Sequence, residues 1–176
     1  MGYTTYFNGQ FDLDKPLTLS QAAYLAKFAE TRRMVRDPEK ALTLPDPIRE
    51  AVGLGIGRQG GYFVGGSGDF GQDRDISILD YNSPPADQPS LWCQWVPDAS
   101  GISIVQDEGE KFYGYVEWIE YLIEHFLGPW GYVLNGSVSW EGEDSDDRGI
   151  IYIKDNVVEA VPDDISNRGP SWGITP

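Results

Sequence analysis

Carboxylates at helical spacing form the first group of residues that could do chemistry. Glu117, Glu120 and Glu124 are three and four residues apart, so a helix would place them on one face. Such carboxylates can bridge metal ions or form an acid/base pair of the glycosidase kind. Helix-borne di-metal sites usually combine them with histidines, and the chain has one histidine, His125. We therefore interpret the three glutamates as a solvated acidic face.

An acidic turn forms the second group. Its five carboxylates belong to Glu141, Glu143, Asp144, Asp146 and Asp147. Oxygen ligands suit Ca²⁺ and Mg²⁺, but this turn lacks the spacing of the calcium-binding loop, with its central glycine and final glutamate. We predict a solvated turn, and we expect neither a metal site nor a cofactor.

Nucleophilic catalysis would have to use His125 or Cys93, the single residues of their types. Cys93 falls in a predicted strand among aromatic residues, where a thiol behaves as a small apolar group. His125 falls on a predicted helix, and the sequence does not complete a catalytic set around it. We expect a protein that is not an enzyme, without catalytic residues.

A glycine-rich stretch, 53–90, offers an alternative site. It matches the dinucleotide-binding fingerprint in letters only, because a glycine-rich coil stands where that site needs a helix. Long irregular segments in compact domains are uncommon and are often functional. The alternative hypothesis is therefore a small-ligand or enzyme site in this stretch. Its polar groups would be Arg58, Asp69, Asp73, Arg74 and Asp75.

The net charge of −15 is distributed unevenly along the chain. Residues 1–75 hold nine basic and ten acidic side chains, whereas residues 76–176 hold four and eighteen. Such a field repels nucleic acid and anionic lipid, and it attracts basic partners, although solubility alone would also explain it. Direct nucleic-acid binding is not expected, since no basic stripe is present.

The leading hypothesis is a non-enzymatic protein-interaction module that binds a basic surface, such as that of a nucleic-acid-binding protein. Charge would steer the partner, and aromatic side chains would anchor it. Trp118 and Tyr121 flank the glutamate face and are the candidate anchors. The acidic turn is part of the same candidate surface.

A small set of elements must position these residues. Alternating and helical patterns predict a strand over 3–13, a helix over 19–36 with Thr18 and Gln21 as a capping box, and a short helix after Pro47. Further along, the patterns predict strands over 91–96 and 102–106, a helix over 112–127, and strands over 132–141, 149–153 and 157–161. Asn135-Gly136 is interpreted as a bulge inside its strand.

This order predicts an α+β fold. Without the insertion it reads β-α-β-β-α-β with an extra C-terminal β-hairpin, a ferredoxin-like split pattern with two helices on one face of a mostly antiparallel sheet. We expect a single domain over 1–165, with the irregular insertion 53–90, and a tail over 166–176. The sequence shows neither a membrane span nor a signal peptide, so we expect a cytoplasmic protein.

Several strings carry a resemblance to a known group of proteins. EKFYGYVEWIEYLIEHFLGPWGYVLNG, followed by EGEDSDDRG and IYIKDNVV, resembles a family of small acidic proteins from bacteriophages and bacterial genomes that has no assigned activity. ETRRMVRD, PDPIREAVGLGIG and LWCQWVP follow the same pattern. The resemblance implies a phage setting in the host cytoplasm and favours an inhibitor of host defence or of a nucleic-acid enzyme. A virion or assembly component is a third hypothesis.

Overall fold

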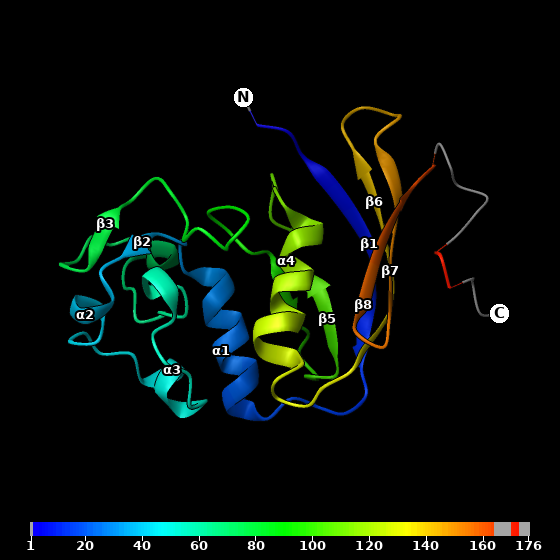
Figure 1. The fold of residues 1–176 in the computed structure, drawn as a ribbon. Coiled ribbons are helices and arrows are strands. Elements are labelled where there is room, and N and C mark those ends of the chain that lie inside the picture. The colour runs from blue at the N-terminus through cyan, green and yellow to red at the C-terminus, as the bar shows by residue number, and fades with distance from the viewer. Residues whose placement is uncertain (1, 164–169, 173–176) are drawn as a thin grey trace. The chain divides into compact units, whose positions relative to one another are not determined.

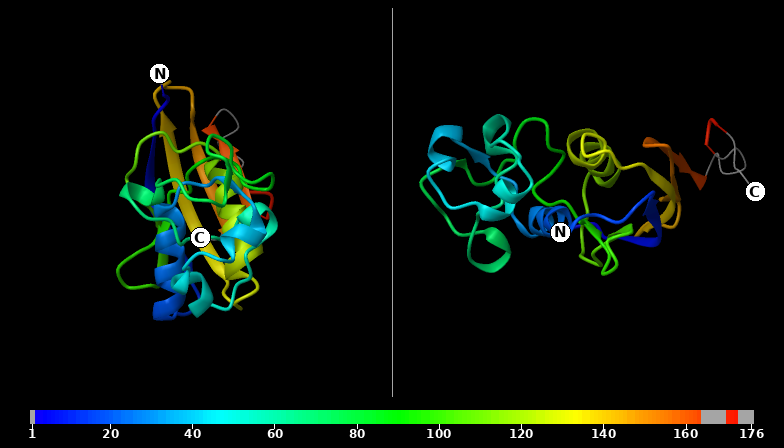
Figure 2. Two further views of the ribbon diagram at one scale, coloured as in Figure 1. Left: turned by 90° about the vertical axis from the view of Figure 1, so that its left-hand side faces the viewer. Right: turned by 90° about the horizontal axis from the view of Figure 1, so that it is seen from below.

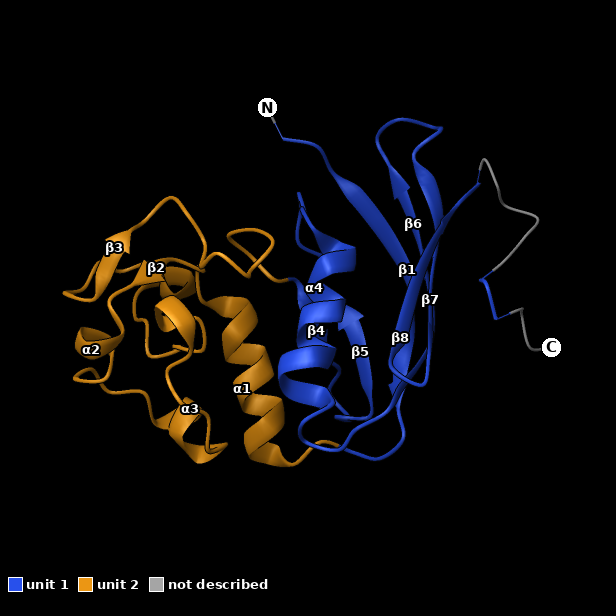
Figure 3. Ribbon diagram, in the orientation of Figure 1, with its two compact units in different colours: residues 1–16, 94–176 blue, residues 17–93 orange. Residues whose placement is uncertain are grey.

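The chain divides into two compact units. The computed structural model describes residues 2–163 and 170–172, so the predicted tail 166–176 lies mostly outside the described residues. Unit 1 comprises residues 1–16 and 94–176, and unit 2 comprises residues 17–93 (Figure 3). Unit 2 is therefore one continuous segment, and it contains the whole of the predicted insertion.

Unit 1 is built on a six-stranded sheet (Figure 1). The strands are β1 (Thr5–Leu13), β4 (Trp95–Pro97), β5 (Ser103–Gln106), β6 (Leu134–Gly142), β7 (Arg148–Lys154) and β8 (Val157–Pro162). They lie in the order β4-β5-β1-β6-β7-β8, and every neighbouring pair is antiparallel. The prediction of an α+β fold with a mostly antiparallel sheet is confirmed.

The central strand β1 is paired very differently on its two sides. Against β6 it pairs along its full length, from Thr5 opposite Gly142 to Leu13 opposite Leu134. Against β5 it pairs only at Phe11 and Asp12. The N-terminal half of β1 therefore has a strand neighbour on one side only.

Helix α4 (Tyr115–Leu122) continues into the π-helical turn η3 (Ile123–Leu127) and covers one face of this sheet (Figures 1 and 2). The predicted helix over 112–127 begins three residues late, because Gly114 adopts a left-handed conformation with φ 70°. The helix approaches both β4 and β8, the two outermost strands, so the sheet curves around it.

Aromatic rings fill the space between α4 and the sheet. The ring of Phe7 lies 5.5 Å from that of Trp95, 5.8 Å from that of Phe112 and 5.0 Å from that of Tyr115, measured between centroids. The Trp95 indole N–H donates to the Tyr115 carbonyl at 2.8 Å, which fixes the start of the helix over the sheet. Edge-on ring contacts of this kind each add to the hydrophobic stabilisation.

Two glycines allow the close approach of β1 and β6. Gly9 and Gly136 have φ values of 112° and 136°. A Cβ on Gly9 would lie 2.7 Å from the Ser137 oxygen, and one on Gly136 would lie 2.9 Å from the Gln10 oxygen. The register runs through both without a shift, so the predicted bulge at Asn135-Gly136 is wrong. Glycine is needed there for backbone conformation and for space.

Unit 2 combines short helices with irregular chain. Its elements are α1 (Leu19–Glu30), β2 (Val35–Arg36), α2 (Pro38–Ala41), α3 (Pro47–Ala51), the 3₁₀ turns η1 (Arg58–Gly60) and η2 (Asp69–Gly71), and β3 (Ile78–Asp80). The Thr18–Gln21 capping box and the helix after Pro47 are confirmed. The helix predicted over 19–36 ends at Glu30, because the chain extends from Thr31 and Val35–Arg36 pairs with β3. The strand predicted over 91–96 begins only at Trp95.

Buried arginines hold the irregular stretch of unit 2 in place. Arg33 donates to the carbonyls of Gly61 at 2.6 Å and Phe63 at 3.1 Å. Arg36 donates to Asp75 at 2.8 Å, and its guanidinium lies 4.1 Å from the centre of the Phe63 ring. Arg33 and Arg36 are each 2% exposed. Because each guanidinium carries five donors, one such side chain can fix several backbone carbonyls that no strand or helix would pair.

Candidate functional site

Tyr3 joins three segments at the end of the sheet where β1 begins and β6 ends. Its hydroxyl donates to Asp147 Oδ2 at 2.8 Å and accepts from the Asp144 N–H at 3.1 Å. Its backbone N–H donates to the Tyr113 hydroxyl at 3.0 Å. The N-terminal segment, the β6–β7 turn and the segment before α4 therefore meet here, at what we call the acidic end.

The β6–β7 turn uses two of its five predicted carboxylates to hold its shape. Asp147 Oδ1 accepts from the Trp140 indole N–H at 3.0 Å, and Glu143 Oε1 accepts from the Thr4 N–H at 2.6 Å. Glu141, Asp144 and Asp146 are exposed. The turn thus combines an ordered framework with free negative charge.

A second acidic loop, which the sequence reasoning missed, lies between β5 and α4. It carries the exposed side chains of Asp107, Glu108 and Glu110. Although Asp107 reaches solvent, partial desolvation by its neighbours raises the pKa of its carboxyl, and a 2.8 Å hydrogen bond from the Gly109 N–H offsets only part of this rise. The signal available in the sequence was three carboxylates within four residues at the junction of a strand and a helix.

The glutamates of α4 extend the same field. Glu117, Glu120 and Glu124 are exposed. Burial raises the pKa of Glu120, and repulsion by Glu117 and Glu124 adds to the rise. Burial also raises the pKa of Tyr115 to about 12, with further contributions from the charges of Asp147 and Glu117. The Tyr115 ring lies 5.9 Å from that of Trp140, which donates to Asp147, so the start of α4, with Glu117 in its first turn, lies beside the β6–β7 turn.

The predicted aromatic anchors are not on this surface. Trp118 is 0% exposed and Tyr121 is 4% exposed, so the two rings predicted as anchors are buried. The buried side of α4 is simply wider than the stripe inferred from periodicity. Tyr6 and Tyr113, which are 66% and 50% exposed, present rings at the acidic end instead. The sequence signal for its outward direction was that Tyr6 lies at the same alternate positions of β1 as Asn8, Gln10 and Asp12.

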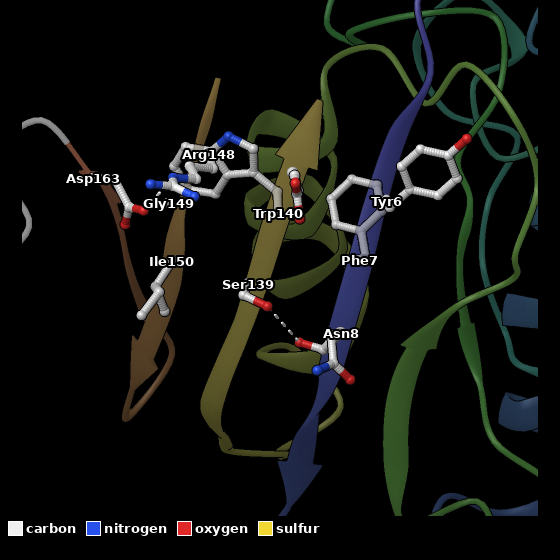
Figure 4. Close-up of a pocket in the computed structure, with 10 residues that line it drawn as sticks. Tyr6, Phe7, Asn8, Ser139, Trp140, Arg148, Gly149, Ile150 and Asp163 are labelled. Carbon is white, nitrogen blue, oxygen red and sulfur yellow. Dashed lines mark hydrogen bonds and ion pairs between the residues drawn. The ribbon is translucent and has the colours of Figure 1, made fainter. Parts of the chain in front are cut away.

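A shallow hollow of about 390 Å³ lies beside Tyr6, across strands β1, β6 and β7 (Figure 4). Glu141 stands opposite both Tyr6 and Arg148 in the strand register. Arg148 donates to Asp163 at 2.9 Å, and the other charged residue of the lining is Glu141. The lining offers an aromatic ring, hydrogen-bonding groups and an ion pair, which suit binding.

The polar groups of the alternative site in 53–90 are used separately. Asp75 pairs with Arg36, a residue outside the predicted set, at 2.8 Å. Asp73 accepts from the Ser67 hydroxyl at 3.2 Å, and the Arg74 guanidinium lies 4.5 Å from the centre of the Tyr81 ring. Arg58 and Asp69 are exposed. The described contacts join none of the five to another.

The two residues considered for nucleophilic chemistry sit in packed surroundings. The His125 ring stacks on that of Tyr121 with 4.1 Å between centroids. Cys93 is buried, with 0% of its surface exposed. Within residues 2–163 and 170–172, no three metal-binding side chains are grouped so that they could hold an ion. The same residues contain no helix with the length and apolar character needed to cross a membrane.

Comparisons of the chain with models of known protein families, with characterised proteins and with solved structures give no match. The function is therefore inferred from the chemistry of the acidic end.

Proposed function

We propose that unit 1 is a non-enzymatic interaction module whose acidic end binds a basic protein surface. The observation that carries the proposal is the unbalanced charge of this unit. Unit 1 holds five basic and eighteen acidic residues, a net of −13, whereas unit 2 holds eight and ten, a net of −2. Among the described carboxylates of unit 1, only that of Asp163 takes part in an ion pair.

Folding alone gives no reason to gather these charges. Like charges four residues apart on a helix destabilise it by a few tenths of a kcal/mol. The rise in the pKa of Glu120 has repulsion by its neighbours as one of its causes. A basic partner would turn this repulsion into attraction, and it would be steered towards the acidic end as it approached. The exposed rings of Tyr6 and Tyr113 supply contact area for such a partner.

We extend the proposal to the class of partner, a host protein whose basic surface normally contacts nucleic acid. Closely spaced carboxylates can bind the Lys and Arg side chains that would otherwise contact phosphates. The resemblance to phage-encoded proteins supports an inhibitory role of this kind in the host cytoplasm. We also propose that the sheet of unit 1 is ferredoxin-like in its strand order, because β4-β5-β1-β6 is the order found in a split β-α-β-β-α-β unit. The first helix of that pattern would be α1, which belongs to unit 2.

Capture from bacterial lysate at low and high salt tests the proposal. The immobilised wild-type chain should retain a basic protein at low salt and release it at high salt. The triple variant Glu117→Lys, Glu120→Lys, Glu124→Lys should lose this retention, because it reverses the charge of the exposed glutamate face of α4.

A matched control separates position from net charge. Glu30→Lys, Glu39→Lys and Glu50→Lys change the charge by the same amount at exposed sites of unit 2, and this variant should retain the partner. Equal capture by both triple variants and the wild type would refute the proposal.

A further inference from the structure

The N-terminal half of β1 presents an open backbone edge. The Asp14 N–H donates to the Val133 oxygen on the β6 side at 3.0 Å, and the Leu13 N–H donates to the Ile102 oxygen on the β5 side at 2.7 Å. Successive residues of a strand direct their backbone N–H and C=O groups to opposite sides. Thr5, Phe7 and Gly9 lie an even number of residues from Leu13, so their groups point to the β5 side.

Strand β5 does not pair with β1 over these residues. Its pairing with β1 stops at Phe11 opposite Ile104. The described contacts show no ladder partner for the outward N–H and C=O groups of Thr5, Phe7 and Gly9. Unpaired edges of this kind are templates for an added strand.

Two hollows of about 370 and 480 Å³ lie along this edge. Residues 4–9 of the N-terminal segment and β1 form one bank, and residues 105–110 form the other. We call this region the β1 slot. Phe7 lines both hollows, and its ring packs on Trp95. The five residues from Thr5 to Gly9 span about 17 Å when extended, enough to pair with a segment of about five residues.

The side chains around the slot are mostly acidic, which favours a basic segment as its ligand. Asp107, Glu108 and Glu110 line the far bank, and the Glu143 carboxylate binds the Thr4 N–H at the near end. Lys111 lies beside Gly2 and is the cation among these residues. Partial desolvation raises the pKa of Asp107, so a nearby cation would stabilise its ionised form.

We propose that the β1 slot binds an extended, basic segment of the partner protein as an additional strand between β1 and β5. This inference rests on the proposed function and deepens it by naming the form of the ligand. The backbone of the segment bonds to Thr5, Phe7 and Gly9, and its alternate Lys or Arg side chains meet the carboxylates of the 107–110 loop. A flat basic surface, or a second copy of this chain, would not use the slot in this way.

Synthetic eight-residue peptides test the proposal on the intact chain. The probe alternates Lys and Val, and its controls are a Glu/Val peptide and a Lys/Val peptide methylated at alternate backbone nitrogens. Binding of the Lys/Val peptide should slow hydrogen exchange at the amides of Thr5, Phe7 and Gly9. Methylation should weaken binding by about tenfold, because several backbone hydrogen bonds are lost while the charge is kept.

Variants of the far bank supply the second readout. Glu108→Lys with Glu110→Lys should weaken binding of the Lys/Val peptide, whereas Asp14→Lys with Asp155→Lys, outside the slot and equal in charge change, should leave it nearly unchanged. If backbone methylation does not weaken peptide binding, or if the amides protected from exchange lie outside β1, the proposal of the β1 slot is overturned. The proposal would also be overturned if two copies of the chain formed a dimer through this edge and the peptide could not dissociate it. If lysate capture still depended on the α4 glutamates after such a result, the proposed function would stand without the slot.

Discussion

Asp75 accepts hydrogen bonds from Arg36 and Ser77, whereas Glu120 faces two other glutamates. Burial opposes ionisation of Asp75, but the bonds from Ser77 and Arg36 together outweigh it and lower the pKa of this carboxyl. The pKa of Glu120 is raised instead. At the scale of single residues, the carboxylates therefore form two groups. Some bind hydrogen-bond donors or cations and stabilise the fold, and others face further carboxylates and are repelled by them.

Replacing Asp75 tests the structural group. Asp75→Ala leaves Arg36, which is 2% exposed, without its counter-charge, so we expect a loss of about 3 kcal/mol in the free energy of unfolding at neutral pH. The stability that Asp75 contributes is present above its unfolded pKa and is lost as the pH falls through its lowered folded value. The cost should therefore shrink in acid, which urea unfolding at two pH values would measure.

Asp69→Ala is the matched control for this substitution. Asp69 is exposed and lies in the same irregular stretch, so its removal should change the free energy of unfolding by less than about 0.5 kcal/mol. A cost for Asp75→Ala no larger than that of the control would show that Arg36 does not depend on this partner.

Among the elements, the pairing of β1 with β6 depends on glycine at two crossing points. Gly136→Ala would place a Cβ 2.9 Å from the Gln10 oxygen at a φ of 136°, so we expect a destabilisation of about 1–3 kcal/mol. Thermal unfolding would measure it. Gly55→Ala is the control, since a Cβ there meets no atom within 4 Å, and its effect should be small. A neutral Gly136→Ala would contradict the close approach.

Local patterns predicted the elements whose determinants are local. The Asp155-Asn156 turn joins β7 to β8 as predicted, with φ values of 49° and 68°. The end of α1 was misplaced, because Val35–Arg36 pairs with a strand more than forty residues away. The order within 53–90 was not predictable, because it depends on Arg33 and Arg36 meeting carbonyls and carboxylates distant in sequence. Periodicity carries no signal for such contacts.

The charged part of the candidate site could be predicted, because charged side chains are usually exposed to solvent. The glutamates of α4 are exposed as expected, since burying an unpaired carboxylate is costly. Trp118 and Tyr121 were misassigned, because periodicity placed them on the flank of the helix, whereas both are buried and their rings lie 5.4 Å apart between centroids. The 107–110 loop joined the site only through tertiary structure, where it faces the edge of β1.

At the scale of the whole molecule, the excess charge predicts a stability that rises with salt. Raising the ionic strength from about 0.01 M to about 1 M shortens the Debye length from about 30 Å to about 3 Å, which screens repulsion within unit 1. We expect the thermal midpoint to increase over this range by calorimetry. The triple variant Glu117→Gln, Glu120→Gln, Glu124→Gln should show a smaller increase.

The comparison needs a variant of equal charge elsewhere. Glu30→Gln, Glu39→Gln and Glu50→Gln remove the same charge from unit 2, where the net charge is only −2, and should keep most of the salt response. Identical salt responses in both variants would indicate a general effect of salt on folding, independent of the acidic end.

The pairing of β1 with β6 has a consequence for synthesis on the ribosome. Phe7 pairs with Trp140, so at 5–20 residues per second the first strand waits about 7–27 s for its partner to be made. Unit 2, a continuous segment, emerges completely during that interval. We therefore expect unit 2 to fold before β1 has its partner, so that during synthesis β1 presents unpaired backbone groups on both of its sides.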